Sequence, residues 1–211
     1  MTLIDQMPSV GRKFLMAGKS GLNLTKAEDP ALFEAAYGVQ QDWIAPMLRA
    51  FGPTEVQDWA RGLGQHVFTG STGRVFPDVM KASPLLRAWM GRLAELGVQV
   101  QTRWRWLGWA TDGLRFDTPD GARVLRARAT ILALGGACWA RRGSDGAWAE
   151  WIGGDPAPFA PSNMGLNVAW SAHMAPHFGT PVKGIALHAG ARVSRGEIVV
   201  SAQGMEGGGI Y

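Results

Sequence analysis

The sequence predicts a mixed α/β fold in which parallel strands share a domain with a β-meander and a second, β-rich domain follows. Three observations support this prediction. Residues 2–5 form a short apolar strand that ends in a carboxylate. Residues 129–134 (ATILAL) are apolar throughout, as in a parallel strand that is covered on both faces. Residues 103–126 alternate between apolar and polar around turn residues, so a meander stands where a crossover helix usually joins parallel strands.

Composition and charge limit the class of protein. The chain has 211 residues, of which 46% are hydrophobic and 18% charged, which is typical of a globular protein with its own core. The net charge of +4 is compatible with a nucleic acid or an anionic cofactor as partner. Because the longest apolar run, residues 129–140, is shorter than the roughly 18 residues of a membrane span and no signal peptide opens the chain, we expect a soluble cytoplasmic protein with no membrane partner.

Start and stop signals predict a helical block over about residues 29–62. Asp29 is a good N-cap and Pro30 suits the first helical position. A second helix is expected over residues 40–51. Thr54, with a glutamine three residues later, resembles a capping box and is expected to begin the third helix.

One long helix and several short strands follow the helical block. Ser83-Pro84 is expected to cap the helix, and Gly97 ends it. Trp104 and Trp106 alternate with arginines, so we expect both indoles on the packed face of a strand. The expected strands are residues 66–69, 74–76, 98–100, 103–110, 114–116 and 123–125.

The composition changes near residue 155. Pro156, Pro158 and Pro161 make a stiff connection into shorter β-like runs. We therefore expect two domains, residues 1–154 and 155–211. The strands expected in the second domain are residues 166–169, 182–187 and 197–201.

The glycine-punctuated segment 11–25 (GRKFLMAGKSGLNLT), expected to be a long loop, is the strongest candidate for ligand binding. Its glycines permit close approach of the backbone, and backbone amides in such a loop can cradle a phosphate or pyrophosphate. A surface loop without a ligand is the other interpretation. Gly18-Lys19-Ser20 also resembles the end of a P-loop, but Lys13 stands where that motif needs glycine, and Gly21 follows where a helix should begin.

Further polar residues leave alternatives open. A carboxylate at the end of the second strand of a dinucleotide-binding unit holds the ribose about twenty residues after a glycine fingerprint. If Asp5 has that role, the fingerprint is absent from this sequence; otherwise Asp5 is a turn residue. Arginines and tryptophans over residues 102–109 also suit single-stranded nucleic acid, although strand packing explains them. Pro176 separates His173 from His177, so we expect no metal site.

Three blocks resemble a known family: residues 11–25, residues 70–89 (GSTGRVFPDVMKASPLLRAW) and residues 132–148 (LALGGACWARRGSDGAW). They are similar to a bacterial flavoprotein family, the BaiN-like NAD(P)/FAD-dependent oxidoreductases, in the branch with GLNLT rather than RCNLT. The similarity continues through PSNMGLNVAW and GEIVVSAQGMEGGGIY, so it covers nearly the whole chain.

The resemblance implies a partial glutathione-reductase-like FAD-binding domain with a helical insertion, followed by the start of an inserted β-rich domain. The intact relative would transfer hydride or electrons through FAD, with NAD(P)H as a candidate donor. The family's N-terminal glycine fingerprint and closing C-terminal flavin segment are missing, so we expect a truncated fragment that binds FAD weakly or not at all and is inactive alone. No catalytic residue is assigned, and the substrate and oligomeric state stay open.

The resemblance also implies a set of cofactor contacts. Asp5 corresponds to the ribose-binding acid, and Val100 to the strand that meets adenine. One serine-to-cysteine departure falls at Cys138, the only cysteine, which excludes an internal disulfide and which we expect to be a buried core thiol. The loop along the flavin and pyrophosphate corresponds to Gly11, Arg12, Lys13, Gly18, Ser20, Gly21, Leu22 and Asn23, and the double-glycine turn to Ala133, Gly135 and Gly136.

Overall fold

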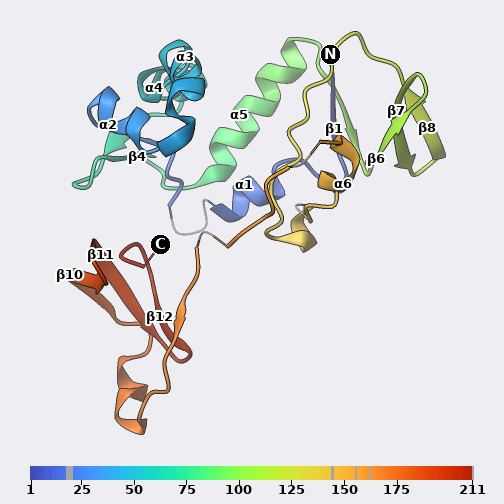
Figure 1. Ribbon diagram of the computed structural model, residues 1–211. Helices are drawn as coiled ribbons and strands as arrows, with labels where there is room; N and C mark the ends of the chain where they lie inside the picture. The colour runs from blue at the N-terminus through green and yellow to red at the C-terminus, as the bar shows by residue number, and fades with distance from the viewer. Residues whose placement is uncertain (18–20, 144, 155, 162, 211) are drawn as a thin grey trace. The chain divides into compact units, whose positions relative to one another are not determined.

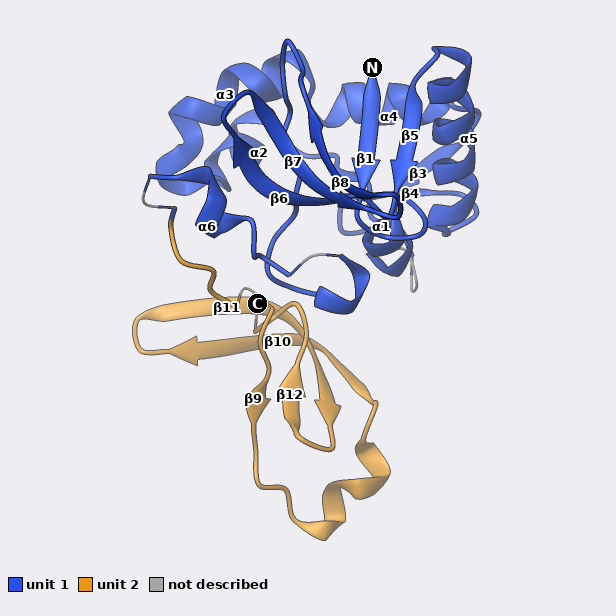
Figure 2. Ribbon diagram, turned by 90° about the vertical axis from the view of Figure 1, so that its right-hand side faces the viewer, with its two compact units in different colours: residues 1–156 blue, residues 157–211 orange. Residues whose placement is uncertain are grey.

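The structure is a computed structural model that describes residues 1–17, 21–143, 145–154, 156–161 and 163–210. The chain divides into two compact units, residues 1–156 and residues 157–211 (Figure 2). Each unit has strands of its own, and each is described separately below.

A parallel strand pair organises the first unit; β1 is labelled in Figure 1, and both strands are labelled in Figure 2. Strand β1 (Thr2–Asp5) pairs in parallel with β5 (Gln99–Thr102), with Asp5 opposite Thr102 at the shared carboxyl end. Helix α5 (Ala82–Glu95) leads directly into β5. The sequence-based prediction of parallel strands in a mixed α/β fold is therefore confirmed for this pair.

The segment after β1 is helical where a loop was expected. Helix α1 (Arg12–Ala17) begins with a hydrogen bond in which Leu15 N–H donates to the Gly11 carbonyl at 2.9 Å. Phe14 on α1 packs against a cluster of buried residues that includes Leu85 of α5. The prediction of a continuous loop over residues 11–25 was wrong because this packing, which is distant in sequence, stabilises a short helix.

The helical block was predicted well, with a correction at one helix start. The Asp29 carboxylate accepts the Ala31 N–H at 2.9 Å, so Asp29 is the N-cap as expected. The third helix, however, begins before Thr54: the Glu55 carboxylate accepts the Gly52 N–H at 2.8 Å, which makes Gly52 the N-cap. The block consists of α2 (Pro30–Ala35), the 3₁₀ helix η1 (Gly38–Gln40), α3 (Gln41–Ala50) and α4 (Pro53–Gly62).

A small antiparallel sheet lies next to the first hydrophobic core. Strands β2 (Thr25–Lys26), β4 (Arg74–Pro77) and β3 (Val67–Thr69) pair in that order. Ser83 does not cap α5 as expected, because the helix already begins at Ala82 and Lys81 is its N-cap. The buried residues of the first core are Leu22, Ala60, Leu63, Ala82 and Leu85.

The expected β-meander forms the second core. Strands β6 (Arg105–Ala110), β7 (Gly113–Thr118) and β8 (Gly121–Leu125) pair antiparallel in sequence order. Trp106 is buried with Leu114 and Phe116, and its ring lies edge to face with that of Trp151 at 5.5 Å between centroids. Trp104 packs against the same core while Arg103 and Arg105 are exposed. The strand expected over residues 103–110 begins only at Arg105, because Arg103 has φ +60°, so the alternation of a strand applies from Arg105 onward.

The apolar run 129–134 is not a strand, which corrects the sequence-based prediction. Ile131 is 89% exposed, whereas Leu132 and Leu134 pack against the second core. Only alternate side chains are covered, and the run pairs with no strand of the described chain. A strand needs the backbone of a neighbour, and apolar composition alone does not supply one. The 3₁₀ helix η2 (Ala140–Arg142) and helix α6 (Ala149–Ile152) follow.

The second unit is an antiparallel sheet with strand order β10-β11-β12-β9. Ile198 and Val200 on β11 are its most buried apolar side chains. Both His173 and His177 lie in the 3₁₀ helix η3 (Ala172–His177). The strands are β9 (Leu166–Asn167), β10 (Pro181–Ala189), β11 (Arg192–Ser201) and β12 (Gly204–Glu206).

Two kinds of feature are absent from the described residues. None of the helices there combines the length and the apolar character needed to cross a membrane. Likewise, in the same part of the chain, no three His, Cys, Asp or Glu side chains are grouped so that they could hold a metal ion.

Leu85 provides a test of the first core. Its side chain is fully buried in α5, so Leu85→Ala should lower the free energy of unfolding by about 2–5 kcal/mol through lost burial and the cavity that remains. The measurement is urea denaturation followed by circular dichroism. Leu96→Ala, at a position that is 70% exposed, is the matched control and should change stability by less than about 0.5 kcal/mol. Equal effects of the two substitutions would contradict this core.

Candidate nucleotide-binding site

The candidate site lies at the carboxyl ends of β1 and β5. Ligands of open α/β sheets bind outside the carboxyl ends of parallel strands. The backbone holds the two strand ends together beyond their ladder: Trp104 N–H donates to the Asp5 carbonyl at 3.2 Å, and Arg103 N–H donates to the Met7 carbonyl at 3.1 Å. These backbone hydrogen bonds therefore fix the relative positions of the two strand ends at which a ligand would bind.

Asp5 is the central residue of this edge. Its carboxylate is half-buried, and Oδ1 accepts the N–H of Met7 at 2.8 Å. Among the described residues, no donor reaches the second oxygen, Oδ2. One oxygen therefore fixes the orientation of the carboxylate and the other is available to a donor on a ligand.

The turn between β1 and α1 requires glycine. Gly11 has φ +70°, and a Cβ there would lie 2.8 Å from Leu86 Cδ2 on α5. Next to it, Arg12 Nε donates to Ser9 Oγ at 2.9 Å, which holds the guanidinium against the same turn. In this structure the glycine allows α1 to approach α5, so close helix packing explains Gly11 without a cofactor.

A second segment, residues 135–143, lies against this turn. Gln6 Nε2 donates to the Gly143 carbonyl at 2.8 Å, and Lys13 Nζ lies 2.9 Å from Cys138 Sγ. A Cβ on Gly143 would lie 2.7 Å from Met7 Cγ, so the two backbones are close. Two segments expected to contact a cofactor are thus brought together, although more than a hundred residues separate them.

Cys138 is exposed, which corrects the expectation of a buried core thiol. Trp139, which follows it, has φ +65° and is itself largely exposed, so the chain turns away from the second core at this point. The apolar run before it had suggested burial, but that run covers the core with alternate side chains only. Cys138 is therefore exposed because the backbone leaves the second core at this position.

The double-glycine turn is fixed by an indole. Trp148 Nε1 donates to the Gly135 carbonyl at 2.9 Å, and Gly135 has φ +74°. Ala133 is exposed and Gly136 half-buried. Trp148 also packs against the second core, so the meander positions this turn indirectly.

The GLNLT part of segment 11–25 is held elsewhere. Leu22 is buried in the first core, its N–H donates to the Met80 carbonyl at 3.4 Å, and Asn23 is exposed. Gly21 has φ +134° and lies beside Met80. The backbone contacts of this part therefore go to β4 and the turn after it. Gly18 and Ser20, together with Lys19, lie outside the described residues.

Two sequence-based hypotheses can be compared with this geometry. In a P-loop a helix begins at the lysine and serine, but residues 21–24 are not helical and lead into β2. Val100, expected near adenine, is half-buried on β5 opposite Leu3, two residues before the strand end.

Sequence reasoning missed the residues that shape the site without contacting a ligand. Gln6 and Met7 had a signal, because they directly follow Asp5 and must form the turn that caps its carboxylate. Trp148 had none, since nothing local indicates that its indole bonds to a carbonyl thirteen residues earlier.

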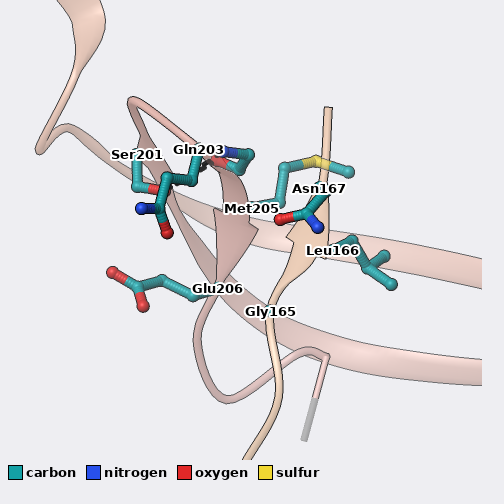
Figure 3. A pocket seen from close by; sticks show the side chains of 8 residues that line it. Gly165, Leu166, Asn167, Ser201, Gln203, Met205 and Glu206 are labelled. Atoms are coloured by element: carbon teal, nitrogen blue, oxygen red, sulfur yellow. Dashed lines mark hydrogen bonds between the residues drawn. The ribbon is translucent and has the colours of Figure 1, made fainter. Parts of the chain in front are cut away.

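A hollow of about 170 Å³ in the second unit is separate from these residues (Figure 3). It lies at the β11–β12 turn beside β9, where Ser201 Oγ accepts the Gly204 N–H at 3.2 Å. A Cβ on Gly204 would overlap the Leu166 carbonyl oxygen, so close strand packing shapes the hollow. None of the expected cofactor contacts lines it.

The parallel pair, the acidic residue at the end of its first strand and the glycine turn that follows define a Rossmann-type nucleotide-binding domain. Comparison with protein families identifies it further. The family described as HI0933-like protein Rossmann domain matches residues 1–158, and the chain belongs to that family. No curated protein matches the chain.

Gly11→Ala tests the packing of the β1–α1 turn. The positive φ should cost about 1–3 kcal/mol in any residue with a Cβ, and displacing Leu86 should add about 1 kcal/mol. Gly121→Ala is the control, because Gly121 has φ +94° and a Cβ added there would meet no atom within 4 Å. Thermal and urea unfolding of the two variants measure the difference. Equal destabilisation would contradict the close approach of the turn to α5.

Proposed function

We propose that the first unit is the FAD-binding domain of a flavoprotein oxidoreductase, of the BaiN-like, glutathione-reductase-like kind. The observation that carries the proposal is the carboxylate of Asp5 at the end of a parallel strand, within a chain whose residues 1–158 match a Rossmann family. In the same proposal, the second unit is a β-rich domain that accompanies the FAD-binding domain.

The geometry at Asp5 suits the adenosine ribose of FAD. A ribose offers hydroxyl donors, and a carboxylate that accepts them is the usual partner in dinucleotide-binding units. Oδ1 is already held by the Met7 N–H, so Oδ2 can accept a hydroxyl without reorganisation of the side chain. Because the fixed oxygen orients the free one, the residues present fit the group.

The charges near this carboxylate suit a diphosphate. Arg12 and Lys13 follow the glycine turn directly, and Lys13 Nζ lies next to segment 135–143 through Cys138. Cations at this place attract the anionic part of FAD. We propose the whole implied set as cofactor contacts: Asp5, Gly11, Arg12, Lys13, Gly18, Ser20, Gly21, Leu22, Asn23, Val100, Ala133, Gly135 and Gly136.

When bound, FAD would supply hydride or electron transfer, with NAD(P)H as the proposed donor. The residues of this chain would bind and orient the cofactor: the Asp5 carboxylate through the ribose, and the cations through the diphosphate. No side chain of the described site is assigned a proton-transfer role.

Asp5→Ala tests the proposal. Loss of a hydrogen bond to a charged acceptor is worth about 1.5–3 kcal/mol, so the affinity for FAD should fall roughly tenfold or more. FMN lacks the adenosine ribose, and its weaker binding should not change. Titrations of the 211-residue chain with each flavin, followed by flavin fluorescence or calorimetry, measure both affinities.

Asp117→Ala is the control, because Asp117 is an exposed carboxylate on β7 and lies outside the proposed site. It should leave the affinity for FAD unchanged. Equal affinities of the wild type and Asp5→Ala for FAD would contradict the proposal.

A further inference from the structure

Helix α3 presents an apolar face to solvent. Its buried side consists of Ala45 with the half-buried Ile44 and Leu48. On the opposite side, Trp43 and Met47 are 66% and 47% exposed. A surface helix normally directs polar residues outward, so α3 is apolar on both sides.

The exposed side chains form one continuous strip. We call it the α3 apolar face; it comprises Val39, Trp43, Pro46, Met47, Ala50 and Phe51. Successive helical residues are about 100° apart, so positions 43, 46, 47 and 50 lie along one side of α3. Val39 before the helix and Phe51 after it are also exposed, at 98% and 54%.

Two opposite charges border the same edge of this strip. Asp42 and Arg49 are seven residues apart, which is about two helical turns, so they lie on the same flank. Both are exposed, and Arg49 makes a contact of 3.4 Å between its Nε and Glu34 Oε1 within the chain. The two positions are also equally far from the helix centre between Ala45 and Pro46.

We propose that the α3 apolar face binds a second copy of this chain, with the two α3 helices antiparallel about a twofold axis. In such an isologous pair the same surface of both copies forms the interface. A residue on one helix therefore faces the residue of the other helix that lies equally far on the opposite side of the helix centre. Asp42 of each copy then lies across from Arg49 of the other. Met47 of the other copy then lies about one residue from the level of Trp43, near enough for a favourable sulfur–aromatic contact.

The exposed area agrees with a small protein interface. With aromatic side chains contributing about 150–250 Å² each, the face exposes on the order of 400 Å². A standard interface uses roughly 800 Å² from each partner, so the strip can form its apolar centre with polar residues around it.

The charges favour a second copy over a lipid surface. Helices that lie on membranes carry lysines and arginines along the polar flank. With Glu34, which contacts Arg49, this flank of α3 has two acids and one base, so it has no positive charge to attract anionic lipid. The pair of Asp42 and Arg49 is self-complementary when the helix meets its own copy in the antiparallel direction. This inference does not depend on the proposed cofactor.

Charge reversal tests the register. The intact chain should show a concentration-dependent dimer in sedimentation equilibrium, and Asp42→Arg should weaken it because it places two arginines opposite each other. Asp42→Arg combined with Arg49→Asp restores opposite charges between the copies and should recover most of the lost affinity; the Arg49–Glu34 contact within each chain is not restored. Trp43→Lys should weaken the dimer about thirtyfold or more, as expected for a central aromatic residue.

Leu96→Lys is the matched control, because Leu96 is 70% exposed and lies outside α3. It should leave the dimer unchanged, and circular dichroism should show that every variant keeps the wild-type helix content. A monomer at all concentrations would overturn the proposal, as would a dimer insensitive to Trp43→Lys. Failure of the double reversal to recover affinity would overturn the antiparallel register. A monomer that sediments with vesicles of anionic phospholipid would favour the lipid surface instead.

Discussion

Parallel pairing of β1 with β5 joins residues 2–5 to residues 99–102, and the chain between them must leave and return to the same edge. The helical block, the small sheet and α5 all lie in the connection between β1 and β5. Parallel strands cannot be joined by a tight turn. The long connection that the parallel pairing of β1 and β5 requires therefore contains the first core, in which Leu22 and Leu85 are buried together.

The segment from Ile4 to Phe14 is held by two cores. Ile4 packs against the second core, which the meander forms, and Phe14 packs against the first core. Asp5 and the glycine turn lie between these anchors, so packing at both ends constrains the geometry of the carboxylate. Residues that contact no ligand thus determine where the proposed ligand groups lie, a dependence expected of a site supported by rigid elements.

Contacts with residues 135–148, late in the sequence of the first unit, complete the edge at the carboxyl ends of β1 and β5. Gln6 and Lys13 reach the carbonyl of Gly143 and the thiol of Cys138, and Trp148 holds the Gly135 carbonyl. The apolar run 129–134 pairs with no strand of the described residues, and the packing of Leu132 and Leu134 attaches it to the second core instead. Cys138 and Ile131 are both exposed because no neighbouring strand covers this segment.

Local signals in the sequence determined the helix that begins at Asp29, the meander and the inward direction of Trp104 and Trp106, because capping and alternation act over a few residues. They also placed Asp5 at a strand end. Only the tertiary structure decided that residues 12–17 are helical, that residues 129–134 form no ladder and that Lys13 meets Cys138. Each of these depends on a partner distant in sequence, and composition or periodicity within a window cannot specify that partner.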